Sequence, residues 1–147
     1  MLHVITHDED EFAHLILSDP VRPHIPVQHR LGPNGRVLVL QNHAQEPQSV
    51  ICVAFSDHVV TEESDLFSYE ADCATVCMLY SIWSLCKGGG QAMLPELKTW
   101  LHEHHAHIQR MVTLSPQTEM ARRFHLKNGA WELQMNSATV NFEYDLR

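Results

Sequence analysis

The stretch Ala74-Thr-Val-Cys-Met-Leu-Tyr-Ser-Ile-Trp-Ser-Leu-Cys-Lys-Gly-Gly-Gly-Gln-Ala-Met-Leu94 decides the fold class. Residues 74–83 are nearly all apolar, which is typical of a buried central strand. Three glycines end that strand, and apolar residues then recur at helical spacing over residues 91–105. A further apolar run covers residues 108–114. Because a strand–helix–strand unit needs a right-handed crossover, we expect the two strands to be parallel neighbours.

Shorter patterns on either side extend this unit. Alternating or β-branched runs predict strands at residues 2–5, 36–41, 49–55, 131–135 and 139–144. Helices are predicted at residues 8–18 and 118–127, with Ser115 as N-cap of the second and Pro116 after it. Prolines predict a loop over residues 20–33, and residues 62–68 fit a short helix or a loop. The order predicts an α/β or α+β sheet with helices on its faces.

Composition narrows the class of protein. The 147 residues fit one domain. With 10 basic against 18 acidic residues, we expect no binding to nucleic acid or to an anionic membrane. The sequence shows no signal-peptide pattern and no membrane-spanning run, so we expect a cytoplasmic protein. Four cysteines without a Cys-x-x-Cys pair predict reduced core residues: Cys52, Cys73, Cys77 and Cys86.

The loop Lys87-Gly88-Gly89-Gly90 suggests an anion site. Glycines before a helix let the backbone approach an anion closely, and the helix N-terminus offers unpaired N–H groups. The loop has neither the Gly-Lys-Ser/Thr ending of a P-loop nor the spacing of a dinucleotide fingerprint. Three glycines here are also compatible with a merely flexible connection.

The stretch from Gly88 to Leu94 resembles the coenzyme A loop of GNAT acetyltransferases. Gly88 and Gly90 match the two small positions of that motif, whereas Leu85 stands where the family has Arg or Gln. The resemblance implies a mixed, mostly antiparallel sheet and an acyl-coenzyme A substrate, with no metal. It implies that the pantetheine arm runs beside Ser81, Ile82 and Trp83. It implies a pyrophosphate site formed by Lys87, Gly88, Gly89, Gly90, Gln91 and Ala92.

A second motif adds a candidate catalytic residue. The stretch from Ala121 to Leu133 is similar to the GNAT motif that carries a tyrosine acid, but His125 takes the tyrosine's place. Its phrase Phe-His-Leu-x-Asn-Gly-Ala resembles the catalytic domain of malonyl-CoA decarboxylases, as do residues 80–82 and 113–116. That resemblance implies that Ser81 and His125 are the functional pair. It does not extend to the decarboxylases' N-terminal helical domain, the segment before the histidine helix is shorter, and Trp83 replaces a serine.

Three functions follow from these motifs. The first is decarboxylation of malonyl-CoA or a related β-carboxyacyl-CoA. The second is transfer of acetyl to an amine, which usually needs a carboxylate base. Residues 73–84 contain none, although Glu62, Glu63 or Asp65 could reach in. The third is acyl-CoA binding without catalysis.

The remaining features favour structural roles. The histidines at residues 102–107 match no metal motif and fit a helix C-terminus. Trp100 and Trp131 are predicted to be core, and Arg122 and Arg123 to lie on a solvated helix face. The last strands are expected to leave a sheet edge that must be covered, so the sequence is also compatible with a homodimer.

Overall fold

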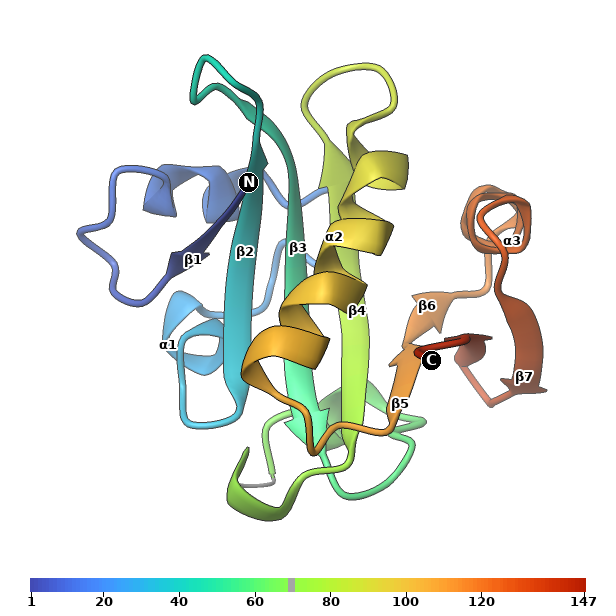
Figure 1. Cartoon of the computed structure of the whole chain (residues 1–147). Helices are drawn as coiled ribbons and strands as arrows, with labels where there is room; N and C mark the ends of the chain where they lie inside the picture. Colours follow the sequence, from blue (N-terminus) through green and yellow to red (C-terminus); the bar gives the residue numbers. More distant parts are fainter. Residues whose placement is uncertain (69–70) are drawn as a thin grey trace.

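The computed structural model describes residues 1–68 and 71–147 (Figure 1). The strands are β1 (Leu2–Ile5), β2 (Gly35–Gln41), β3 (Pro47–Ser56), β4 (Val76–Ser84), β5 (Arg110–Thr113), β6 (Ser115–Pro116), β7 (Trp131–Met135) and β8 (Thr139–Tyr144). The α-helices are α1 (Val27–Arg30), α2 (Gly89–His104) and α3 (Glu119–Lys127). Short 3₁₀ helices are η1 (Ala13–Ser18), η2 (Glu63–Asp65) and η3 (Ala71–Cys73).

One sheet runs through the molecule in the order β1-β2-β3-β4-β5-β8-β6, and β7 pairs with β8. Strands β4 and β5 are parallel, as the crossover through α2 predicts, and the other described pairs are antiparallel. The predicted mixed, mostly antiparallel sheet is confirmed.

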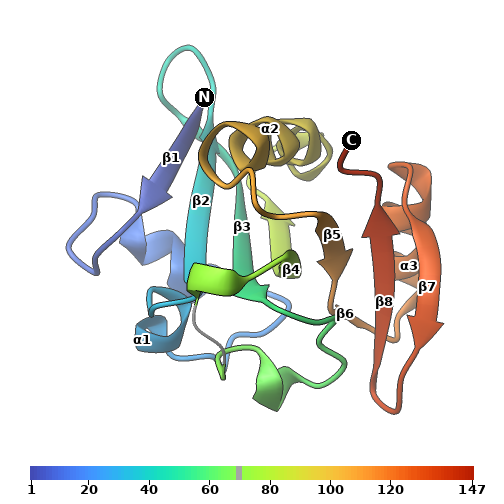
Figure 2. The ribbon, with the colours of Figure 1, turned by 60° about the horizontal axis from the view of Figure 1, so that its bottom comes forward.

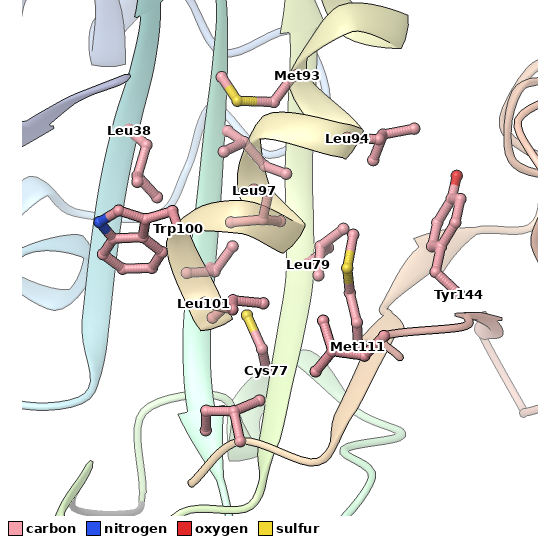
Figure 3. Close-up of a cluster of buried hydrophobic side chains, with 14 of the residues drawn as sticks. Leu38, Cys77, Leu79, Met93, Leu94, Leu97, Trp100, Leu101, Met111 and Tyr144 are labelled. Atoms are coloured by element: carbon pink, nitrogen blue, oxygen red, sulfur yellow. The ribbon is translucent and has the colours of Figure 1, made fainter. Parts of the chain in front are cut away.

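Helix α2 covers one face of the sheet (Figure 2). Met93, Leu97 and Leu101 recur every four residues on its buried side and pack against the sheet (Figure 3). A separate apolar layer on the opposite face is covered by the N-terminal segment, which contributes Ile16 and Ile25. The sheet is therefore buried on both faces at β3 and β4, and this fixes the position of β4.

The first predicted helix, residues 8–18, is wrong. Residues 13–18 form the 3₁₀ helix η1, and the preceding residues form turns. The Asp10 carboxylate accepts the Phe12 N–H at 2.9 Å and contacts His3 Nε2 at 2.8 Å. A side chain that caps its own neighbours in this way competes with helix formation.

The predicted N-cap of α3 also needs correction. Ser115 lies in β6 and its hydroxyl bonds Thr113 Oγ1 at 2.7 Å. Thr118 caps α3 instead, accepting the Ala121 N–H at 3.2 Å. The prolyl ring of Pro116 is accommodated in the short β6 strand beside β8.

Three predictions of burial are wrong, and three are confirmed, that of Trp100 among them. Cys73 and Cys86 are exposed, and Trp131 is 46% exposed because β7 lies outside the main path of the sheet. Cys52 and Cys77 are buried core residues, as expected. No helix in the described ranges is long and apolar enough to cross a membrane.

Candidate active site in the splay of the sheet

A bulge in β4 opens the sheet. Cys52 pairs with Ser81 but the next residue, Val53, pairs with Leu79, so β4 carries one extra residue. Among the described residues, the last backbone hydrogen bond of β4 on this flank runs from the Leu114 N–H to the Leu79 carbonyl at 2.8 Å. Beyond this hydrogen bond, β4 continues beside β3, while the segment that follows β5 turns away from β4 into β6 (Figure 1). Bulges commonly end pairing and re-aim side chains next to functional sites.

A cavity of about 580 Å³ fills this splay, a volume within the range of ligand pockets. Its lining is mainly apolar and comes from β4, from the β5–β6 junction, from α3, from the start of α2 and from the N-terminal segment. The lining residues are Pro20, Val21, Leu79, Tyr80, Ser81, Ile82, Trp83, Ser84, Gly90, Leu114, Ser115, Pro116, Thr118, Met120, Ala121, Phe124 and His125. The cavity thus extends from the α2 side of the sheet to the side of Pro20.

His125 reaches the cavity from the buried side of α3. Its ring stacks on Phe142 with centroids 5.3 Å apart, and Nδ1 lies 2.7 Å from the Tyr144 hydroxyl oxygen. Burial lowers the pKa of His125 to about 4, so the ring is neutral at pH 7. Burial likewise raises the pKa of Tyr144, which keeps its proton.

The Tyr144 contact fixes the tautomer of His125. A hydroxyl that only accepted from Nδ1 would leave its own hydrogen without an acceptor among the described residues. We therefore assign the Tyr144 O–H as donor to Nδ1, which puts the ring proton on Nε2. A neutral imidazole with its N–H at Nε2 can donate to a ligand oxygen.

Ser81 lines the same cavity as His125, so the structure brings the two predicted catalytic residues together. Ser81 is 3% exposed, and its Oγ makes no hydrogen bond of good geometry to any described residue, although the Asp19 carboxylate lies close to it. Burial alone would raise the pKa of Asp19, but hydrogen bonds from Arg30 and from the Arg22 N–H lower it, and the nearby Ser81 hydroxyl acts in the same direction. Ser81 therefore lies beside a buried carboxylate.

The glycine loop lies at the α2 side of the cavity. Gly88 has a φ of 80°, which favours glycine, and a Cβ on Gly89 would lie 2.1 Å from Gln48 O. The N–H groups of Gly89 and Gly90 are bonded to Cys86 O and to Ser84 Oγ. These two groups are thus not free for an anion in this structure.

Of the residues predicted for the pyrophosphate site, Gly90 belongs to the cavity lining. Lys87, Gln91 and Ala92 are exposed and lie outside it. Ile82 and Trp83 belong to it as well. The residues predicted to lie beside the pantetheine arm thus gather at one cavity, whereas Gly90 alone of those predicted to bind the pyrophosphate is among its lining residues.

Sequence reasoning missed a buried polar cluster behind Ser81. Asp19 and Arg30, both almost fully buried, form an ion pair of 2.7 Å. Asp19 also accepts the N–H groups of Val21 and Arg22, and the Arg22 guanidinium donates to the carbonyl of Tyr80. This cluster holds the Pro20 wall of the cavity against the bulge. The proline-rich sequence predicts only a loop, and it contains no periodic signal for buried charges.

The remaining candidates lie elsewhere. Glu63 bonds Arg22 and His24 and does not line the cavity. The Cys86 thiol contacts Gln48 Oε1 at 2.9 Å. Among the described residues, no group of three or more His, Cys, Asp or Glu side chains is placed to hold a metal ion.

No protein-family model and no curated protein sequence matches this chain, but solved structures do. A malonyl-CoA decarboxylase from Rhodopseudomonas palustris has a TM-score of 0.74 and 17% identity, over 99% of this chain and 56% of its own. GCN5 from Tetrahymena has a TM-score of 0.65 and 12% identity, over 100% of this chain and 96% of its own. The GphF GNAT-like decarboxylase in complex with isobutyryl-CoA has a TM-score of 0.60 and 14% identity, over 76% and 78%.

The chain has the GNAT fold. The suspected resemblance to GNAT proteins and to malonyl-CoA decarboxylases is confirmed at the level of structure. This chain spans little more than half the length of the R. palustris decarboxylase. At these identities the likeness establishes the fold, and the reaction must be argued from the site itself.

Proposed function

We propose that this chain binds an acyl-coenzyme A in the splay between β4 and β6 and decarboxylates malonyl-CoA or a related β-carboxyacyl-CoA. The observation that carries the proposal is that His125 and Ser81 line one mainly apolar cavity, with Nε2–H of a neutral His125 as a donor. The GNAT-fold decarboxylases among the similar structures, one of them in complex with isobutyryl-CoA, support the choice of substrate.

The proposed reaction breaks the bond between the α-carbon and the carboxylate. Its electron pair moves toward the thioester oxygen, so CO₂ leaves and an enolate forms. Donors placed where charge develops contribute most to such a step, and His125 Nε2–H serves this role. The α-carbon then takes a proton from Nε2, and a solvent proton replaces it there, so one proton is consumed for each CO₂ released. Tyr144 keeps its own proton and stays bonded to Nδ1. Ser81 orients the carboxylate or the thioester oxygen.

The cavity favours this reaction over amine acetylation. None of the described residues that line it is Asp or Glu, so no carboxylate in the described part of the chain borders the cavity to take a proton from an amine. His125, whose pKa is lowered to about 4, is a weak base. Acetyl transfer stays the second candidate, because GCN5 shares the fold. Acyl-CoA binding without catalysis is the third.

The test is mass spectrometry of malonyl-, methylmalonyl- and acetyl-CoA after incubation with the protein. We expect acetyl-CoA to appear from malonyl-CoA, and His125→Ala to slow this roughly 100- to 10,000-fold. His107→Ala is the matched control, since this exposed histidine lies outside the cavity. An active His125→Ala protein would refute the assignment of His125. Binding without conversion would redirect the search to amine acceptors.

A further inference from the structure

Three buried atoms that make no hydrogen bond to any described residue come from one short piece of β4: Tyr80 Oη, Ser81 Oγ and Trp83 Nε1. All three residues line the cavity. Leaving a buried donor unpaired is costly, so each such group in a folded protein calls for an explanation. For Tyr80, Cys52 is a near neighbour, and for Ser81 the Asp19 carboxylate is. Trp83 Nε1 remains to be explained.

The bulge puts Ser81 and Trp83 on one face of the sheet. Ser81 lies opposite Cys52 and Trp83 opposite Val50, and both β3 residues belong to the apolar layer on the side away from α2. Residues two apart on one strand face are roughly 6.6 Å apart. Their hydroxyl and indole N–H therefore face the same side of the sheet, where Pro20 and Val21 close the cavity.

The charges behind this face favour an anion. The buried cluster contains two guanidiniums, Arg22 and Arg30, against one carboxylate, Asp19. The balancing carboxylate, Glu63, is 37% exposed and contacts Arg22 and His24 toward solvent. Arg22 also donates to the carbonyl of Tyr80, directly before Ser81. The local field at this wall is therefore more positive than the net charge of the chain implies.

We propose that Trp83, two residues beyond Ser81, forms a subsite for the free carboxylate of the acyl group, with its Nε1–H as the donor that distinguishes a carboxylated from an uncharged acyl-CoA. This inference rests on the proposed function and names its substrate class. The carboxylate is lost as CO₂, so a bond to it strengthens substrate binding and not the transition state. Trp83 is accordingly a specificity residue.

The test compares Trp83→Phe, which keeps an aromatic ring and removes the N–H, with the parent protein. Both carry His125→Gln to stop turnover, and calorimetry gives Kd for malonyl-CoA and acetyl-CoA. We expect the parent to prefer malonyl-CoA and Trp83→Phe to weaken malonyl-CoA binding about tenfold or more, with acetyl-CoA unchanged. Trp131→Phe, on exposed β7, is the matched control and keeps the preference.

The outcomes separate the two claims. If the parent binds both thioesters and Trp83→Phe keeps the parent's preference, the carboxylate subsite is refuted while the acyl-CoA site stands. If the parent binds neither, the proposed function is refuted together with the subsite. In the turnover-competent protein, Trp83→Phe should raise KM for malonyl-CoA and leave kcat/KM nearly unchanged, and a fall in kcat without a rise in KM would contradict the assignment.

Discussion

The two halves of β4 are held in different ways. Up to Leu79 the strand is paired with β3 on one side and β5 on the other, and backbone hydrogen bonds fix it. Beyond the bulge it keeps β3 alone, and side chains take over on the open flank: Arg22 on the Tyr80 carbonyl and Ser84 on the Gly90 N–H. Where pairing stops, a cavity becomes possible, and polar side chains must keep its walls in place.

The largest expected effect comes from breaking the support of the unpaired half. Arg30→Met leaves the Asp19 carboxylate buried without its ion pair, which should lower the free energy of unfolding by about 3–5 kcal/mol. Denaturant unfolding measures this. Arg123→Met, an exposed residue of α3, is the control and should change stability by less than about 0.5 kcal/mol. Equal effects of both variants would show that the cluster does not support the wall.

Acid should destabilise the protein through His125, which lines the cavity beside the unpaired half of β4. Its pKa is about 4 in the folded state against about 6.5 unfolded, so the unfolded state binds the proton more readily. This stabilising contribution, about 3 kcal/mol, is complete above pH 6.5 and is lost as pH falls toward 4. Unfolding curves at several pH values should show a shallower decline for His125→Gln than for wild type. Identical declines would contradict the lowered pKa.

A smaller effect should follow from Tyr144→Phe. It removes the hydroxyl that donates to His125 Nδ1 but keeps the ring in the core, so the protein should stay folded. Without that donor the tautomer is no longer fixed, and we expect kcat to fall about tenfold, which corresponds to roughly 1.4 kcal/mol. Steady-state kinetics gives the value. An unchanged kcat would mean that Tyr144 serves packing alone.

The paired half of β4 was predictable from sequence, and so were the strand–helix–strand unit and the glycine loop. Hydrophobic periodicity over residues 74–114 is strong because these residues are buried by their neighbours along the chain. The resemblance of the motif around His125 to malonyl-CoA decarboxylases predicted the candidate catalytic pair, Ser81 and His125. The pair does share a cavity, although the roles of its members stay predictions.

The bulge that begins the unpaired half, and the polar side chains that support this half, were not predictable. The bulge at Ser81 depends on the register with β3, which the sequence does not display. Asp19, Arg22 and Arg30 bond across the fold and leave no periodic pattern. Asp10 shows the same limit locally, since its side chain caps a turn where acidic residues had suggested a helix.

The central claim is that an acyl-CoA occupies the splay beyond the bulge. Backbone hydrogen exchange with and without acetyl-CoA tests it most directly. We expect slower exchange in residues 80–92 and 118–125, and no change in residues 76–79. Protection confined to the separate surface hollow beside His24, His29 and Phe67, or no protection anywhere, would contradict the account.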